Sequence, residues 1–433
     1  MTKTKTILQQ LGRFESRNVI FTEPDGSWPI VWDRARGIHV WDAEGKKYLD
    51  LTAAFGVAAA GHANPRVVQA GQKQMARLLH AMGDVHPHAL KARLARELSR
   101  ITFERWAKTN QKRGKVIFSN SGFEAVESAL KTAMLATGRR GVIAFAGAYH
   151  GLGYGALNAT HREHFRHPFR PQLREFGRFV PFPARPGQLA KVEQAIRRLF
   201  RREKIGALLV EPVQARGGIN LPPPAFLPLL RRLCDEHGAL LILDEIYTGF
   251  GRTGRWFACE HSGVVPDLIC LGKALTGGFP LSACVGRAEL MDAAWPASTG
   301  EAIHTSTFLG HPVGCAMALA QISEIRRLKL CERSAVLGKF LLAGLQELQV
   351  SGFKFQVSPR GLGLMAGVEL TLPGGRPATA AALGAIKTLL RRGYIFLPEG
   401  EHANVISFTP PLTITRAQLA RAVAELHKAL AAA

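Results

Sequence analysis

Two neighbouring stretches of sequence decide the fold of this chain: residues 240–254, LLILDEIYTGFGRTG, and residues 266–286, PDLICLGKALTGGFPLSACVG. In each stretch a short run of Leu and Ile comes first, and the two runs lead to Asp244 and Lys273. Both runs are too short and too apolar for surface helices, which predicts two buried parallel strands. Open α/β sheets bind ligands at the carboxyl ends of such strands, so both side chains are candidate site residues.

The chemistry of an acid and an amine at this place is specific when both are present. Burial disfavours the charged form of a lysine, so Lys273 can lose its proton and attack a carbonyl. A buried Asp244 needs a cationic partner, and a protonated pyridine nitrogen provides one. Each residue alone is also explained by an ordinary helix cap or a solvated charge, but together they predict a pyridoxal 5'-phosphate (PLP) enzyme.

Composition places the chain in an ordinary class of globular proteins. It has 433 residues, of which 47% are apolar and 21% charged, enough to bury more than one core. The amino terminus shows no signal-peptide pattern and no window approaches a membrane span, so we expect a cytoplasmic protein without membrane contact. Six cysteines form no CxxC pair and no metal spacing, which predicts buried free thiols and no metal site.

A formal net charge of +23 raises the question of a nucleic-acid partner. Basic stretches occur in HREHFRHPFRPQLREFGR from His161 and in RRLFRREK from Arg197. Nucleic-acid binding requires charge gathered on one face or a recognisable module, whereas this charge is scattered along the chain. We therefore expect a solvated basic surface and no nucleic-acid partner.

The order of expected elements predicts an α/β fold. Strand and helix patterns alternate from KVIFSNSG at Lys115 to the run that ends at Asp244, which indicates a mostly parallel sheet flanked by helices. From about Gln321 the pattern changes to helix, short strands and a final helix from Thr415. We predict an N-terminal segment (1–65) that packs with a small domain, a large cofactor-binding domain (66–320) and a small C-terminal α/β domain (321–433).

Three strand ends offer further cofactor contacts. Ser121 with Glu124 three residues later fits a capping box at a helix start, where free amides bind phosphate. Tyr149 ends the next strand and has a ring that can lie on a heteroaromatic cofactor, although a core tyrosine is an equal explanation. Glu211 and Gln214 end a third strand, and Gln214 can donate to a phenolic oxygen.

In order along the chain, these segments resemble the class III aminotransferases, which are PLP enzymes of fold type I that include ornithine and 4-aminobutyrate transaminases. The matching text is NSGFEAVESALK, GAYHG, EPVQARGG, LILDEIYTGFGRTG, PDLICLGKALTGGFPLSA and HTSTFLGHPVGCAMALA. GHANP near the start, and RGLGLMAGVEL with TPPLTIT near the end, extend the resemblance over nearly the whole chain.

The resemblance implies a role for each matching residue. Lys273 would form the Schiff base (the internal aldimine) and carry the proton during transfer, and Asp244 would hold the pyridine nitrogen protonated. The other implied cofactor contacts are the phosphate-binding Ser121 and Gly122 with the adjacent Phe123, Tyr149 on the ring with His150 beside it, Glu211, and Gln214 at O3′. Thr307 would reach the phosphate of a neighbouring subunit, which implies a homodimer.

Three positions depart from the family pattern. Phe123 stands where the family has a small residue or threonine, and Leu152 and Ser407 stand where members carry arginines that bind substrate carboxylates. Because neither Leu nor Ser replaces a bidentate arginine, we expect a substrate other than 4-aminobutyrate and a carboxylate held by another arginine, with Arg216 and the arginines of 162–178 as candidates. Glu211 would then lack its family partner.

The predicted function is a PLP-dependent aminotransferase that moves an amino group from an amine, ω-amino acid or amino acid to a keto acid (pyruvate or 2-oxoglutarate) by a ping-pong mechanism. Phe55 and Val57 are predicted pocket walls that favour an apolar or bulky amine, or else simply core. An amino-acid racemase, epimerase or aminomutase is the alternative on the same residues. A non-catalytic basic binding protein is a third reading, which the intact Lys273 and Asp244 oppose.

Overall fold

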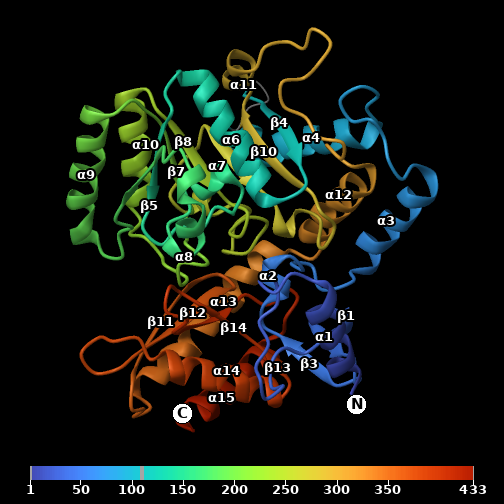
Figure 1. The fold of residues 1–433 in the computed structure, drawn as a ribbon, viewed down its shortest axis with the longest axis vertical. Helices are drawn as coiled ribbons and strands as arrows, with labels where there is room; N and C mark the ends of the chain where they lie inside the picture. Colours follow the sequence, from blue (N-terminus) through green and yellow to red (C-terminus); the bar gives the residue numbers. More distant parts are fainter. Residues whose placement is uncertain (1, 108–111, 433) are drawn as a thin grey trace.

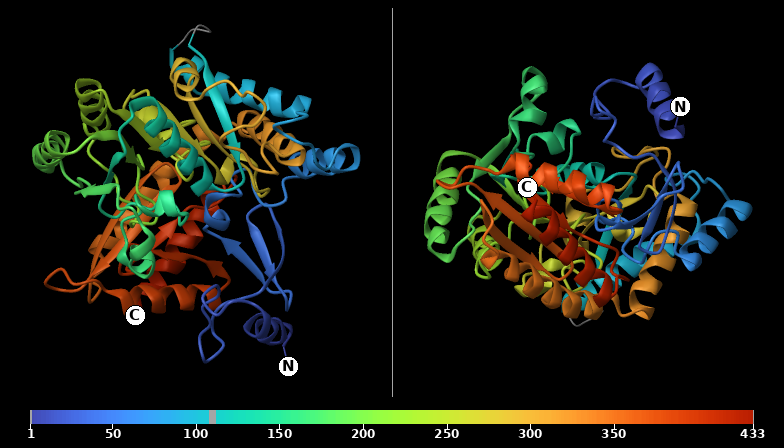
Figure 2. Two further views of the ribbon diagram at one scale, coloured as in Figure 1. Left: turned by 45° about the horizontal axis from the view of Figure 1, so that its top comes forward. Right: turned by 90° about the horizontal axis from the view of Figure 1, so that it is seen from below.

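The computed structural model describes residues 2–107 and 112–432. Figures 1 and 2 show two bodies, one built on a large sheet and a smaller one that contains both ends of the chain. Within the described residues, no helix has both the length and the apolar character needed to cross a membrane.

The large body is built on a seven-stranded sheet with the order β4-β10-β9-β8-β7-β5-β6. Strands β6, β5, β7, β8 and β9 run parallel, and β10 lies antiparallel between β9 and β4. The mostly parallel sheet predicted from the sequence is therefore confirmed. Its strands are β4 (Gly114–Ser119), β5 (Gly141–Phe145), β6 (Gly177–Val180), β7 (Ile205–Val210), β8 (Leu240–Asp244), β9 (Leu268–Leu271) and β10 (Ser282–Arg287).

Helices cover both faces of this sheet because alternate strand residues point to opposite sides. In β7, Ala207 and Leu209 belong to the apolar cluster beneath helix α6, whereas Leu208 and Val210 belong to the cluster on the other face. The helices of this body are α3 (Pro65–Arg77), α4 (Ala89–Ile101), α5 (Phe103–Ala107), α6 (Gly122–Thr137), α7 (Tyr154–Leu157), α8 (Glu163–Arg166), α9 (Leu189–Arg202), α10 (Phe226–His237), α11 (Ala288–Ala294) and α12 (Pro312–Arg327).

The smaller body combines two four-stranded sheets. In one, N-terminal strands pair with a late strand, because Leu49 and Asp50 of β3 lie parallel to Tyr394 and Ile395 of β13. The two sheets have the orders β1-β2-β3-β13 and β11-β12-β15-β14. Their strands are β1 (Trp32–Arg36), β2 (His39–Asp42), β3 (Lys47–Asp50), β11 (Gln356–Leu362), β12 (Met365–Thr371), β13 (Tyr394–Ile395), β14 (Leu397–Glu399) and β15 (Val405–Phe408).

Five helices accompany these sheets: α1 (Lys3–Phe14), α2 (Ala53–Gly56), α13 (Leu330–Gln346), α14 (Thr379–Arg391) and α15 (Arg416–Ala431). Helix α15 begins after Thr415, as the sequence predicts, and the structure shows that the Thr415 side chain caps it. The exact domain boundaries, at residues 65/66 and 320/321, stay a prediction.

Candidate active site

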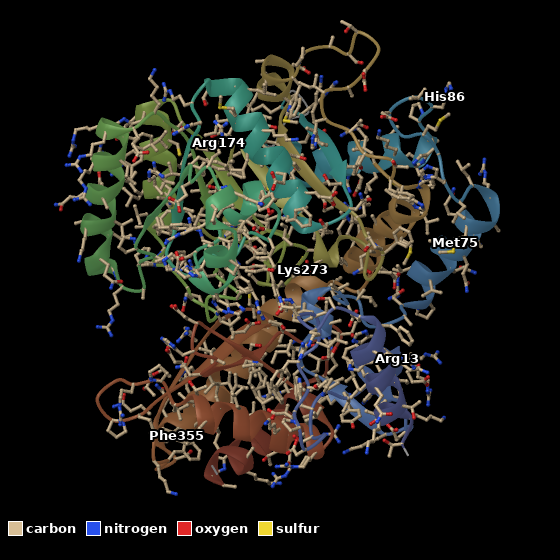
Figure 3. The ribbon with its side chains drawn as sticks, in the orientation of Figure 1. Arg13, Met75, His86, Arg174, Lys273 and Phe355 are labelled. Atoms are coloured by element: carbon tan, nitrogen blue, oxygen red, sulfur yellow. The ribbon has the colours of Figure 1, made fainter. Side chains whose placement is uncertain are left out.

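A cavity of about 400 Å³ opens at the carboxyl ends of the parallel strands. Figure 3 places Lys273 near the middle of the molecule, where the large body meets the smaller one. The residues that line the cavity are Gly122, Phe123, Tyr149, His150, Gly151, Leu152, Glu211, Ala215, Arg216, Asp244, Ile246, Tyr247, Thr248 and Lys273. Residues from five predicted segments therefore meet at one place, as the switch-point rule for α/β sheets predicts.

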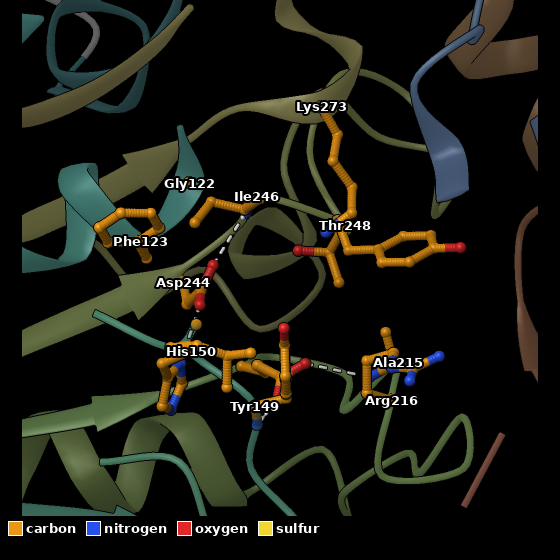
Figure 4. A pocket seen from close by; sticks show the side chains of 14 residues that line it. Gly122, Phe123, Tyr149, His150, Ala215, Arg216, Asp244, Ile246, Thr248 and Lys273 are labelled. Carbon is orange, nitrogen blue, oxygen red and sulfur yellow. Dashed lines mark hydrogen bonds and ion pairs between the residues drawn. The ribbon is translucent and has the colours of Figure 1, made fainter. Parts of the chain in front are cut away.

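Asp244 ends β8 at the floor of the cavity, with 5% of its surface exposed. Its Oδ1 accepts a hydrogen bond from the backbone N–H of Ile246 at 3.1 Å, and its Oδ2 lies 2.8 Å from Nδ1 of His150. The Nε2 atom of His150 is buried and has no hydrogen-bond partner among the described residues. Two contacts thus fix the carboxylate in one orientation within the cavity that Figure 4 shows.

Lys273 follows β9 and extends into the same cavity from the other side (Figure 4). Its φ angle is +25°, a backbone conformation that costs a non-glycine residue about 1–3 kcal/mol and is concentrated at functional sites. Its Nζ lies 4.5 Å from the ring centre of Tyr247. Burial lowers the pKa of the Lys273 amine, although the negative charges of Asp244 and Glu211 oppose this shift. A lowered pKa leaves more of the neutral, nucleophilic amine.

The start of helix α6 forms another wall of the cavity, through Gly122 and Phe123. The Glu124 carboxylate accepts hydrogen bonds from the N–H groups of Asn120 and Ser121 at 3.1 and 2.7 Å, and from the Ser121 hydroxyl at 2.8 Å. A side chain on Gly122 would place its Cβ 3.0 Å from the Ile246 side chain, which would have to shift by a few tenths of an ångström to admit it. Free amides in the first turn of a helix attract anions.

Tyr149 and Glu211 are linked on the remaining side. The Glu211 carboxylate accepts hydrogen bonds from the backbone N–H groups of Tyr149 at 2.9 Å and Ala215 at 3.0 Å. Burial raises the pKa of Glu211 to about 7, while nearby His150 and these two amides lower it. In place of the arginine that family members offer it, Glu211 here holds two backbone segments of the cavity wall.

Several predicted site residues lie away from this cavity. The Gln214 amide donates to the Ala146 carbonyl at 2.7 Å and accepts from Asn220 at 3.1 Å, so its contact with O3′ stays a prediction. Ser407 is buried and donates to the Leu397 carbonyl at 3.1 Å. None of Phe55, Val57 and Thr307 lines the described cavity, and their roles stay predictions too.

The structure adds contacts that sequence reasoning missed. His150 supports Asp244, and Arg216 enters the cavity with Glu399 of the smaller body beside it. The partners in each pair are far apart in the chain, so no local pattern connects them. The arginine itself was one of several candidates, and its position after a strand end was the only signal for it.

The chemical groups around the cavity match those that PLP needs for binding. The cofactor needs an anion site for its phosphate, an acid for its ring nitrogen and a primary amine for its aldehyde. The start of helix α6, the fixed carboxylate of Asp244 and the low-pKa amine of Lys273 offer these three groups around one cavity.

Comparison with known proteins agrees with this fit. The sequence profile of the family described as aminotransferase class-III matches residues 20–430. The chain is 37% identical to the 5-aminovalerate aminotransferase DavT of Pseudomonas aeruginosa, over 92% of both chains. It is 38% identical to a putrescine aminotransferase of Pectobacterium atrosepticum, over 97% of this chain and 86% of the relative.

Solved structures show the same relationship. An amine transaminase from an uncultivated Pseudomonas species, determined in its PLP-bound form, superimposes with a TM-score of 0.85 and 30% identity, over 97% of this chain and 98% of that one. The fold and the site thus define a PLP-dependent transferase of fold type I. The chain belongs to the class III aminotransferases, and it is a PLP-dependent aminotransferase. The isomerase alternative is not favoured, because the named relatives are aminotransferases.

Proposed function

We propose that this cavity moves an amino group from an amine, ω-amino acid or amino acid to pyruvate or 2-oxoglutarate in two half-reactions that share one site. The observation that carries the proposal is the meeting of Lys273, Asp244 and the start of helix α6 around a single cavity, with a cation, Arg216, also on its wall. A ping-pong enzyme needs such a shared site, because donor and acceptor occupy it in turn.

PLP, when bound, supplies an aldehyde that condenses with primary amines and a ring that accepts electrons. Lys273 is the residue we assign to its covalent attachment and to proton transfer, since the Nζ amine reaches the cavity with a lowered pKa. Asp244 would hold the proton on the ring nitrogen, and His150 would keep Asp244 in place through Nδ1. The contact of His150 with Asp244, and the position of Lys273 on the wall of the same cavity, support these roles.

The phosphate end is assigned to Ser121, Gly122 and Phe123 at the start of helix α6. Phe123 contributes only its backbone amide, because its side chain has no hydroxyl. Tyr149 would lie against the ring, supported by the hydrogen bond from its N–H to Glu211.

At the substrate end we propose that 4-aminobutyrate is not the donor. Leu152 presents an apolar, half-exposed side chain to the cavity, and Ser407 is buried with its hydroxyl bound to a carbonyl. Neither binds a carboxylate, so an arginine elsewhere must do so. Measurable turnover of 4-aminobutyrate with 2-oxoglutarate would contradict this part of the proposal.

We also propose a homodimer in which Thr307 contributes to the neighbouring site. Thr307 is exposed, and its loop carries the exposed Phe308, whose ring lies 5.3 Å from that of His80. A hydrogen bond from Thr305 to Asp84 holds the same two segments together. Exposed apolar side chains that gather on these segments support a contact with a second copy, and they are Leu79, Met82, Val85, Ile303 and Phe308.

A cytoplasmic location is the proposal that best fits the cysteines. All six are buried and none forms a disulfide. Free buried thiols are typical of proteins kept in a reducing compartment.

The experiment that tests the function uses the two half-reactions separately. The PLP-loaded protein is mixed with single amine donors in the absence of any keto acid, and the visible absorbance of the cofactor is followed. We expect conversion to the pyridoxamine form, which pyruvate or 2-oxoglutarate then reverses. Racemisation of an amino acid without any acceptor would instead establish the isomerase.

A further inference from the structure

The Arg216 side chain lies across the cavity from the start of helix α6. Figure 4 shows Gly122 and Phe123 on one side and Arg216 on the other, with Asp244 and Tyr149 between them. Among the described residues that line the cavity, Arg216 is the one arginine. It is therefore placed away from the proposed phosphate site and toward the space left for substrate.

None of the other arginines that the sequence leaves as candidates lines the cavity. Arg166 is buried beside Glu163, and Arg178 is bound to Glu203 at 2.7 Å. Arg162 is half-buried and donates to the backbone carbonyl of Arg216 at 2.7 Å, so it supports the position of Arg216. Of the arginines that the sequence leaves as candidates for binding the substrate carboxylate, Arg216 is therefore the one that the structure favours.

The Arg216 guanidinium faces Glu399, which ends strand β14 in the smaller body. Nη1 of Arg216 lies 3.3 Å from Oε2 of Glu399, and that oxygen accepts no hydrogen bond from a described residue. Well-made arginine–carboxylate hydrogen bonds measure about 2.7–2.9 Å. The pair is therefore loose, and the guanidinium keeps N–H donors that can bind a second carboxylate.

Glu399 nevertheless depends on a cation. Its side chain is only 2% exposed. Burial raises its pKa to about 6, and the positive charges of Arg216, Arg162 and Lys273 oppose that rise. At neutral pH the carboxylate is mostly ionised, and a buried charge of this kind must be paired. In the absence of any other carboxylate, Arg216 is the closest cation that satisfies it.

We propose that Arg216 is the receptor for the substrate carboxylate, and that Glu399 is an internal carboxylate that occupies Arg216 whenever the bound substrate has none. This inference rests on the proposed function, because a ping-pong enzyme must admit carboxylate-bearing acceptors and amine donors to one cavity. A keto acid competes with Glu399 for the guanidinium, whereas a donor without a carboxylate leaves the pair intact. Arg162 and Lys273 remain near Glu399 when Arg216 turns to substrate.

The strand pairing connects Ser407, which stands where family members carry an arginine, with the contact between Glu399 and Arg216. Ser407 on β15 pairs with Leu397 on β14, two residues before Glu399. Serine at 407 leaves no arginine on this sheet edge, and the edge instead presents the acidic Glu399 toward Arg216. The cation that binds carboxylates has thereby moved from the smaller body to the loop after β7.

The test compares three variants of the PLP-loaded protein: Arg216→Gln, Glu399→Gln and Arg360→Gln. The Arg360 guanidinium binds the carbonyls of Gly218 and Ile219, so it holds the same loop, yet it does not line the cavity. Calorimetry gives the Kd for glutarate, which has no keto group and cannot react. Stopped-flow measurements on the pyridoxamine form give the half-saturating concentration and maximal rate with pyruvate.

We expect Arg216→Gln to weaken glutarate binding roughly 10- to 100-fold, as loss of charge-assisted hydrogen bonds predicts. The half-saturating pyruvate concentration rises in parallel, while the maximal rate changes less. Glu399→Gln should act in the opposite direction and tighten glutarate binding by about twofold or more, because the internal competitor is gone. Arg360→Gln should bind glutarate like the unaltered protein.

Two results would overturn the inference. One is unchanged glutarate binding in Arg216→Gln or Glu399→Gln. The other is equal weakening in Arg216→Gln, Glu399→Gln and Arg360→Gln, which would mean that the pair only ties the two bodies together. If the variants bind glutarate as expected but the protein transfers no amino group, only the proposed function is refuted. If the protein transfers amino groups but the variants do not show this binding pattern, only the inference about Arg216 and Glu399 is refuted.

Discussion

At the scale of single residues, the Asp244 carboxylate is the group whose surroundings say most about the chemistry. It is buried, and hydrogen bonds with the N–H of Ile246 and with Nδ1 of His150 orient its two oxygens. A carboxylate held this firmly in a cavity is ready to meet a cation there. In the proposed mechanism Lys273, whose amine has a pKa lowered by burial, attaches the cofactor, and Asp244 retains the proton on its ring nitrogen.

The substitution Asp244→Asn tests that division. The amide keeps the shape of the side chain but lacks the charge that holds a proton on the ring nitrogen. We expect kcat to fall roughly 10- to 150-fold, the equivalent of about 1.5–3 kcal/mol for a hydrogen bond to a charged group. Steady-state kinetics with any active donor–acceptor pair measures the loss.

Asp235→Asn is the matched control for this prediction. Asp235 is an exposed acid on helix α10 that pairs with Arg231 and does not line the cavity. Its kcat should equal that of the unaltered protein. A kcat of Asp244→Asn equal to that of the unaltered protein would show that Asp244 has no role in the reaction.

At the scale of elements, the start of helix α6 combines a structural task with the phosphate binding that we propose for it. Glu124 closes the capping box over Ser121, and the turn that results places Gly122 on the cavity wall. Helix α15 begins with a similar box, in which Gln418 accepts from the N–H and hydroxyl of Thr415 at 2.9 and 2.8 Å. The two capping boxes differ in their surroundings, because the box of helix α6 lies at the cavity and the box of helix α15 does not.

Removing each box separates the two tasks. Glu124→Ala and Gln418→Ala should each lower the free energy of unfolding by about 0.5–2 kcal/mol, the usual effect of a lost cap. Only Glu124→Ala should also weaken PLP binding, because the start of helix α6 lines the cavity and helix α15 does not. Urea unfolding of the cofactor-free protein and equilibrium dialysis with PLP measure the two effects. A loss of PLP affinity in both variants would contradict the assignment of the phosphate site.

The sequence predicts elements well where one local pattern suffices. The apolar runs that end at Asp244 and near Lys273 are buried strands, and Ser121 begins helix α6 with the capping box that the sequence predicts. The contact between Arg216 and Glu399 was not predictable, because it joins a loop of one body to a strand of the other. Burial of a polar side chain at such a junction depends on tertiary packing that no periodicity records.

At the scale of the whole molecule, one group of exposed apolar side chains lies on two segments that touch. His88 lies 2.7 Å from the carbonyl of Gly310, and Thr305 binds Asp84, so residues 78–88 and 303–310 form one face. The proposed dimer would bury this face and bring Thr307 to the site of the other copy.

Hybrid dimers test the sharing of sites. A purified dimer that contains one Lys273→Ala chain and one Thr307→Ala chain has one intact site only if Thr307 serves the neighbouring cavity. We expect about half the activity of the unaltered dimer, since one of its two sites combines both defects. Activity no higher than that of the two parent variants would place Thr307 in its own subunit's site or in none.

The central claim is that this aminotransferase carries PLP on Nζ of Lys273, and borohydride trapping tests it most directly. Sodium borohydride reduces the C=N bond between the cofactor and its lysine, and mass spectrometry of the digested protein then locates the bound pyridoxyl group. The account predicts that the group lies on the peptide that contains Lys273 and is missing from Lys273→Ala. A pyridoxyl group on another lysine, or a visible cofactor band that persists unchanged in Lys273→Ala, would contradict it.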